Sequence, residues 1–197
     1  MKKITFIVAS LALASLTIFL GCKKKPTVVE FDIPYTVDFT IPSSSVSVNV
    51  QKDYPVPDIN TNISKWFSDN NTTVERVGEM TCTKFMLSVV SPTNQSINFI
   101  KELNFLINAN TQEEQQQAFK WITVAQSNTL TALDMTKDYT GSSAGANAKG
   151  VNDINAKNYC TQPSFNLKAR LTPSTTISSN VTLRINCTYH AKGITAN

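Results

Sequence analysis

Four cysteines and one histidine are the residues of this 197-residue chain that could act as nucleophiles, metal ligands or redox partners. Cys82, Cys160 and Cys187 lie far apart in the sequence. With His190 as the only imidazole, this set lacks the ligand spacing of a zinc ribbon. Cys187 and His190 are three positions apart, so on a regular strand they point to opposite faces and do not form a nucleophile and base pair. We therefore expect no catalytic residue and no metal ligand among them.

Carboxylate pairs are the other means by which this sequence could support hydrolysis. Asp32 and Asp38 are the first such pair. On an extended strand they would lie about 20 Å apart, too far for either geometry of a glycoside hydrolase. A hydrolase that uses loop carboxylates remains an alternative, with the candidates Glu113, Glu114, Asp134 and Asp138.

Two polar segments could bind an ion or a phosphate, but neither has the required spacing. Asn152, Asp153 and Asn155 offer oxygen ligands without the regular carboxylate and glycine positions of a calcium loop. Residues 139–150 hold three of the six glycines, but a valine follows Lys149-Gly150 where a phosphate loop needs a hydroxyl residue beside its lysine. We expect no cofactor.

Two aromatic positions could bind a ligand by stacking. Ile63, Trp66 and Phe67 have the i, i+3, i+4 spacing of one or two helical turns, with Asn62 as a candidate N-cap. If buried, Trp66 and Phe67 would plug one end of a β-structure, which is the usual role of aromatics on short helices. If exposed, they would stack on a sugar or insert into a partner. Together with Trp121 they give the alternative of a carbohydrate-binding protein.

The elements that must position these residues are mostly β-strands. Residues 29–41 have an apolar side chain at every odd position, the period of a strand with one buried face. Pro34 cannot donate a backbone hydrogen bond, which indicates an edge strand. The same alternation predicts strands at residues 46–50, 74–90, 104–109, 121–125, 130–135, 165–171 and 181–189.

Regular alternation within residues 74–90 places Thr83 and Phe85 on one face and Cys82 on the other. Residues 96–103 suit a short helical crossover, and the last two strands predict an antiparallel hairpin. About eight strands at short spacing, the absence of a long amphipathic helix and the many Thr, Ser, Asn and Val residues predict an all-β antiparallel sandwich with one or two short helices. An immunoglobulin-like topology is one option.

The first 22 residues have a different character. Lys2 and Lys3 give a positive start, residues 4–20 are apolar apart from Ser and Thr, and Gly21 precedes Cys22. This arrangement resembles a bacterial lipoprotein signal peptide. The resemblance implies cleavage after Gly21 and acylation of the Cys22 thiol, whose acyl chains would hold the protein at a membrane. An ordinary secretory signal and an uncleaved apolar helix are the alternatives.

The net charge of +4 comes from five lysines within the first 25 residues. Two of the 18 basic residues lie in the signal and three at residues 23–25, so the chain from Pro26 carries 13 basic and 14 acidic residues. Nucleic acid is not expected as a partner, because binding phosphates needs a concentrated positive field. The lysines at 23–25 lie near anionic headgroups or form a solvated spacer.

A second resemblance covers most of the chain after the signal. The segments FDIPYTVDFTIP, INFIKELNFLINAN and LRINCTY are similar to those of small, uncharacterised β-sandwich lipoproteins of Bacteroidota envelopes. In that group an acidic stretch after the lipidated cysteine is associated with export to the cell surface, whereas three lysines follow Cys22 here. The resemblance implies a lipid anchor in the outer membrane and favours a domain that faces the periplasm over one at the cell surface.

An exported protein folds in an oxidising compartment, where three further cysteines allow at most one bridge and one free thiol. Cys160–Cys187 is the expected bridge, with Cys160 folding back toward the final hairpin. Cys187 lies on the apolar face of its strand, so a core position for its thiol is the alternative.

The chain is thus divided into a signal peptide (1–21), a lipidated Cys22 with its basic spacer (22–28), one β-sandwich domain (29–193) and a tail (194–197). Roughly 175 residues after the signal suit a single domain. We expect a lipid-anchored module of the cell envelope, without catalytic activity, that binds or scaffolds another envelope protein or a glycan.

Overall fold

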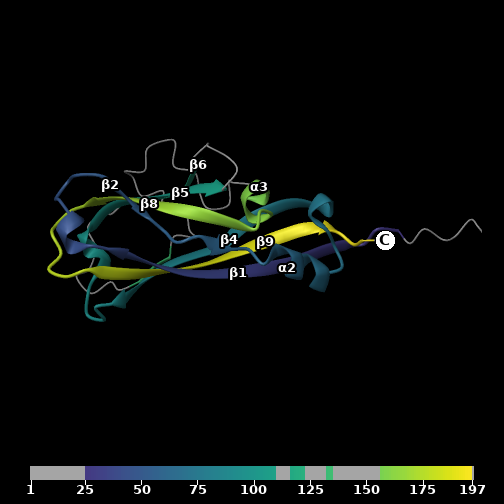
Figure 1. The fold of residues 1–197 in the computed structure, drawn as a ribbon, viewed down its shortest axis with the longest axis horizontal. Coiled ribbons are helices and arrows are strands. Elements are labelled where there is room, and N and C mark those ends of the chain that lie inside the picture. The colour runs from purple at the N-terminus through teal and green to yellow at the C-terminus, as the bar shows by residue number, and fades with distance from the viewer. Residues whose placement is uncertain (1–24, 110–115, 123–131, 135–155, 197) are drawn as a thin grey trace, which may run out of the picture.

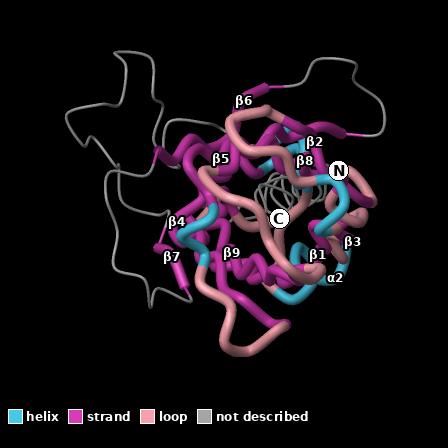
Figure 2. The backbone as a smooth tube through the Cα atoms, turned by 90° about the vertical axis from the view of Figure 1, so that its left-hand side faces the viewer, coloured by secondary structure: helices cyan, strands magenta, loops and turns pink. Residues whose placement is uncertain are grey.

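The strands of the protein form two antiparallel sheets packed face to face (Figure 1). The computed structural model describes residues 25–109, 116–122, 132–134 and 156–196. Figure 2 shows the two layers in a view down the long axis of the molecule. The first sheet has the order β1 (Val28–Ile41), β9 (Val181–Ile194), β4 (Val77–Ser91) and β7 (Ala132–Asp134). The second has the order β2 (Lys52–Pro55), β8 (Ser164–Pro173), β5 (Ile100–Ala109) and β6 (Gln116–Ile122), and β3 (Ile59–Asn60) also pairs with β8. The predicted all-β antiparallel sandwich is confirmed.

Short helices accompany the sheets in the described part of the chain. These are α2 (Ile63–Asp69), α3 (Lys157–Cys160) and 3₁₀ turns at Ser43–Ser45, Val74–Arg76 and Ile97–Phe99. The helix predicted around Trp66 is therefore confirmed as α2. Helix α3 is the second of the one or two short helices that the sequence predicts.

The long antiparallel pair of β1 and β9 defines the two ends of the sandwich. Val28 pairs with Ile194 at one end, and Ile41 pairs with Val181 at the other. The start of β1 and the C-terminal part of the chain therefore share one end, here called the terminal end (Figure 1). The loops that follow Ile41 and precede Val181 form the opposite end, here called the tip. Fourteen residues of strand separate the two ends by about 45 Å.

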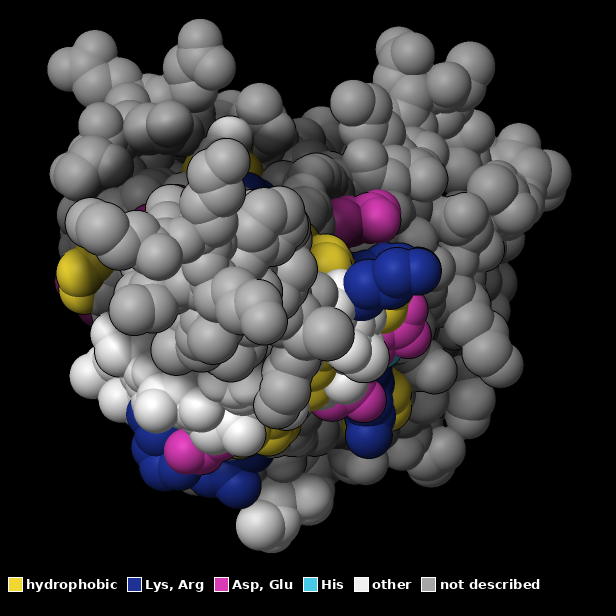
Figure 3. Space-filling view, turned by 90° about the vertical axis from the view of Figure 1, so that its right-hand side faces the viewer, with side chains coloured by type: hydrophobic (Ala, Val, Ile, Leu, Met, Phe, Trp, Pro, Cys, Tyr) yellow, Lys and Arg dark blue, Asp and Glu magenta, His cyan; other side chains and the backbone are white. Residues whose placement is uncertain are grey.

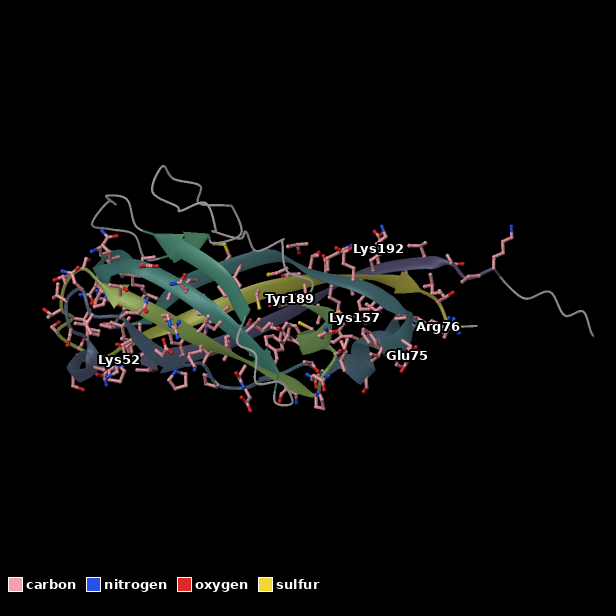
Figure 4. All side chains as sticks on the ribbon, turned by 90° about the horizontal axis from the view of Figure 1, so that it is seen from above. Lys52, Glu75, Arg76, Lys157, Tyr189 and Lys192 are labelled. Carbon is pink, nitrogen blue, oxygen red and sulfur yellow. The ribbon has the colours of Figure 1, made fainter. Side chains whose placement is uncertain are left out.

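The core lies between the sheets and is rich in aromatic rings. Tyr35 on β1 packs edge-on against Phe165 on β8, with ring centroids 5.6 Å apart, so these two residues join the two sheets. Tyr189 contacts both rings from β9, is buried, and lies near the middle of the long axis (Figure 4). Strand β1 is at the edge of its sheet, as Pro34 predicted, and its odd positions Ile33, Tyr35 and Phe39 are buried.

The strand predicted at residues 46–50 is wrong. Val48 and Val50 are 44% and 56% exposed, and β2 begins only at Lys52. The reason is Asn49, which has a left-handed φ of 59° and donates its backbone N–H to the carbonyl of Pro173. A left-handed residue breaks the pleat, so the alternating valines here belong to a turn.

The inward-facing residues of β4 also differ from the prediction. Cys82 and Phe85 are both buried, whereas Thr83 is exposed. The cause is an irregularity in the pairing of β4 with β9 between Cys82 and Lys84, where one strand advances by an extra residue. Such a bulge reverses the inside and outside positions that follow it.

Two predicted connections are also corrected. Within the expected crossover at 96–103, only Ile97–Phe99 form a 3₁₀ turn, and β5 starts at Ile100. The expected hairpin of the last two strands does not form, because β8 and β9 belong to different sheets. The turn after Pro173 therefore crosses between the layers, which places the buried faces of β8 and β9 against each other. Of the strands expected at 121–125 and 130–135, β6 and β7 cover the described parts.

An ion pair links β2 to β8 and makes the stability of the second sheet depend on pH. Arg170 donates two hydrogen bonds to the opposing Asp53, at 2.8 and 3.0 Å. The guanidinium holds the pKa of Asp53 below its ordinary value, chiefly through these hydrogen bonds. Both side chains are about one third exposed, so water screens the pair.

Replacing Asp53 with asparagine is expected to lower the free energy of unfolding at pH 7 by about 0.5 kcal/mol. Since the folded pKa is depressed, the stabilisation is present above the unfolded pKa of about 3.9 and is lost as pH falls through the folded value. Urea unfolding of both proteins from pH 7 to pH 2 checks this. The two curves should converge at the acidic end, and a constant difference at every pH would contradict the assignment.

Candidate functional site

The predicted anchor, Gly21 and Cys22, lies outside the described residues. The described chain begins at Lys25, which is exposed at the terminal end. Among the residues that the structure describes, no helix is both long and apolar enough to cross a membrane.

The three thiols of the folded domain are buried, and each is free. The predicted Cys160–Cys187 bridge is therefore not formed. Cys187 points from β9 into the core, the position given as its alternative, and Cys160 is buried there as well. Burial raises the pKa of Cys82 to about 12 and raises those of Cys160 and Cys187 as well. The thiols are accordingly protonated near neutral pH, and they act as small core side chains.

His190 lies on the outer face of the first sheet, opposite to the face of Cys187, as their spacing predicted. Its Nδ1 is 2.8 Å from the Asp32 carboxylate, and its Nε2 is 3.7 Å from Glu30. Lys192 lies 3.0 Å from the same Glu30, and its hydrogen bond is the main reason why the pKa of that carboxyl is lowered. Both ring nitrogens thus face carboxylates, and the arrangement is a row of cross-strand ion pairs.

The described residues do not define the calcium site or the loop-carboxylate hydrolase site that were considered from the sequence. Within the described ranges, no three His, Cys, Asp or Glu side chains are arranged to hold a metal ion. The backbone of Asp134 lies in β7. The other loop carboxylates and the polar residues 152–155 lie outside the described residues.

Helix α2 uses its aromatic pair mainly for packing. Phe67 is 3% exposed and meets Phe31 edge-on, with ring centroids 6.1 Å apart. Trp66 is partly buried and packs against the core. The predicted plug is confirmed for Phe67, and the pair does not form an exposed stacking platform. Trp121 lies in β6, and its proposed role in binding stays a prediction.

A groove of about 540 Å³ opens beside α2. It is lined by Asn60, Thr61, Asn62, Ile63, Ser64, Lys65, Val74, Thr161 and Pro163. These residues come from β3, the start of α2, the 3₁₀ turn before β4 and the segment after α3. The volume falls within the range of about 300–1,000 Å³ that is usual for small-molecule sites.

The loops at the tip form a second candidate surface. It consists of three loops, residues 42–51, 92–99 and 174–180, here called the tip loops. None of them contains an acidic or a basic residue. Lys52 and Lys101 flank them, and Lys101 donates to the side chain of Asn49. The terminal end, by contrast, carries Lys, Arg, Asp and Glu side chains together (Figure 3).

Hydrogen bonds tie the tip loops to one another. The Asn180 side chain accepts from the backbone N–H of Ser43 at 3.0 Å. Ser174 donates its hydroxyl to the carbonyl of Asn98 at 3.0 Å. These bonds connect the first loop to the third and the second to the third, so the surface is held in one shape.

Sequence reasoning identified α2 but not the groove or the tip. The groove joins residues 60–65 to residues 161–163, which are about a hundred positions apart, and no local pattern reveals that contact. The tip had a readable signal, namely three uncharged loops rich in Ser, Thr and Asn, but their common location depends on the sheet topology.

Comparisons with known proteins do not assign this chain to a family. No family model and no curated protein matches this chain. Among solved structures, it is similar to the capsid protein in the crystal structure of the 60-mer BFDV capsid, with 10% identity, a TM-score of 0.38 and coverage of 87% of this chain and 97% of that one. It is also similar to a Desmodium yellow mottle tymovirus structure, with 9% identity, a TM-score of 0.29 and coverage of 88% and 91%.

Proposed function

We propose that this protein is a lipid-anchored, non-catalytic module of the cell envelope that presents its tip to another envelope component. Cys22 is the proposed acylation site, three residues before the first described residue. The proposal also includes an anchor in the outer membrane and a domain that faces the periplasm.

The opposite character of the two ends is the observation that supports this proposal most. A chain tethered at its start has its terminal end beside the membrane, where the charges of that end meet headgroups and water. The tip then lies about 45 Å farther out, the length of β1. This is the position in which an anchored domain meets a partner.

The chemistry of the tip suits a neutral partner. Its loops offer hydroxyl and carboxamide groups from Ser, Thr and Asn, together with the exposed side chains of Val48 and Val50. A fixed surface loses little conformational entropy on binding, which favours association. Hydrolysis by Cys187 and His190 has less support, because His190 faces carboxylates on one sheet surface while Cys187 lies on the other.

Replacing Cys22 with serine is expected to move most of the protein from the membrane fraction to the soluble fraction, because serine cannot carry the thioether-linked acyl chains that hold it. Fractionation of cells expressing either protein, followed by immunoblotting, measures the change. If the wild type is found in the soluble fraction, the anchor proposal fails.

A photo-crosslinking amino acid at Ser178, an exposed tip position, tests the partner. A specific adduct is expected in cells with the anchored chain, and it should weaken when Cys22 is serine. The matched control places the same amino acid at Thr36, which is exposed on the outer face of β1. Equal adducts from both positions, or none from either, would contradict a docking role for the tip.

A further inference from the structure

We propose that the groove beside α2 is a binding site for a neutral saccharide. This saccharide site is separate from the tip surface proposed above, because the groove lies at the terminal end of the sandwich. Residues just after α2 are bonded to the end of the chain: Thr72 donates its hydroxyl to the carbonyl of Ile194, and the N–H of Ala196 bonds to the carbonyl of Asn71.

The charge of the lining excludes ionic ligands. Among the described residues, Lys65 is the only charged one that lines the groove, and it already forms an ion pair with Asp69 one turn along α2. No carboxylate of the described chain lines the groove, so a cation finds no charged ligand among these residues. An anion would compete with Asp69 for a single exposed ammonium group. The site therefore suits an uncharged ligand.

Three polar side chains at the mouth of the groove have hydrogen-bonding capacity to offer. Asn60 uses its carbonyl oxygen to accept from the N–H of Asn62 at 3.0 Å, which leaves its amide donors available. Asn62 is exposed, and its side chain does not cap α2. Ser64 is exposed on the first turn. Carboxamides and hydroxyls both donate and accept, which matches the neighbouring hydroxyl groups of a sugar ring.

The remaining lining is apolar and suits the C–H face of a sugar. Ile63, Val74 and Pro163 supply it. This mixture of an apolar surface and a few fixed polar groups is usual in small-molecule sites. The lining comes from three separate segments, residues 60–65, Val74 and Thr161 with Pro163, and only one strand residue, Asn60 of the two-residue β3, takes part. A peptide held by backbone pairing therefore fits less well.

Buried hydrogen bonds hold the two walls together before any ligand arrives. The Thr61 side chain is fully buried and donates to the carbonyl of Gln162 at 2.6 Å. Its backbone N–H donates to the carbonyl of Pro163 at 3.1 Å, and its own carbonyl accepts from the Tyr35 hydroxyl at 3.3 Å. The groove is thus preformed, which lowers the cost of binding.

Calorimetric titration of the detergent-solubilised full chain tests the site. The probes are neutral oligomers of N-acetylglucosamine and of glucose, and a neutral Ser/Asn-rich peptide serves as the competing class. The test variant combines Asn62→Gly with Ser64→Ala. Glycine keeps the left-handed φ of 48° at position 62, so the carboxamide is removed without backbone strain. The matched control is Ser68→Ala, an exposed serine of α2 outside the groove.

Saturable binding of at least one oligosaccharide is expected, weakened about tenfold by the double variant, the loss typical of two hydrogen bonds, and unchanged by Ser68→Ala. Amide chemical shifts of the wild type should change at residues 60–65, 161 and 162, a second readout that needs no variant. Absent saccharide binding at millimolar concentrations, binding of the peptide alone, or shifts confined to other surfaces would overturn the proposal.

Discussion

Replacing Phe85 with alanine is expected to lower the free energy of unfolding by about 3–5 kcal/mol, the usual cost of removing a buried phenyl ring. Phe85 is fully buried on β4, and its ring centroid lies 5.1 Å from that of Phe105 on β5. Phe105 also meets Phe39 of β1 edge-on at 6.2 Å. The substitution would therefore open a cavity at the junction of the two sheets. Urea unfolding monitored by circular dichroism measures the loss.

The control for this experiment is Thr83→Ala on the same strand. Regular alternation would place Thr83 on the same face as Phe85, whereas the bulge after Cys82 leaves Thr83 exposed. The change is expected to alter stability by only about 0.5 kcal/mol, as for other surface substitutions. A loss at Thr83 comparable to that at Phe85 would show that the strand runs without the bulge.

Strands β1 and β4 show where the alternation of apolar residues predicts the buried face and where it does not. On β1 the odd positions from Ile33 to Ile41 are inward-facing or partly buried, and the sequence pattern predicted this without error. On β4 one extra residue changes the phase. Threonine and cysteine suit either face of a sheet, so their types do not mark the bulge, and the geometry of the partner strand decides it.

Strand pairing was harder to predict than the strands themselves. β8 and β9 both alternate, and the residues between them are typical of a turn, which is the pattern of a hairpin. A sandwich can use the same local pattern to connect its two layers. Each long strand pairs with partners far away in sequence, β9 with β1 and β4, and β8 with β2 and β5. Local residue types do not predict which distant strands pair with each other.

The candidate site likewise has a part that the sequence predicts, helix α2, and a part that it does not predict, the groove. Spacing of Ile63, Trp66 and Phe67 was sufficient to predict α2 and its buried face, since both depend on neighbours in sequence. The groove depends on Thr61 reaching Gln162 and Pro163 across the fold. The bridge expected between Cys160 and Cys187 likewise depended on tertiary positions that the sequence does not give, and both cysteines are free in the core.

Replacing Gly193 with alanine is the second substitution with a large expected cost, about 1–3 kcal/mol. Gly193 is buried on β9, where it pairs with Val29 on one side and Val77 on the other. A Cβ atom there would lie 2.7 Å from the carbonyl oxygen of Arg76 and 3.0 Å from the Cα of Val77. Both are backbone atoms, so the clash is relieved only by moving β4 away from β9. Urea unfolding again measures the loss.

Gly78 provides the matched control, because it lies on β4 next to Val77, the residue that pairs with Gly193. A Cβ at Gly78 would have its nearest contact at 4.0 Å, the carbonyl oxygen of Lys192, so it has open space. In a strand, alanine in place of glycine reduces the entropy of the unfolded chain, and Gly78→Ala is expected to be neutral or to stabilise by about 0.5 kcal/mol. The two substitutions are chemically identical, and their opposite signs would follow from the close approach at Gly193 alone. If Gly193→Ala also stabilises, β4 and β9 are farther apart at the terminal end than their pairing indicates.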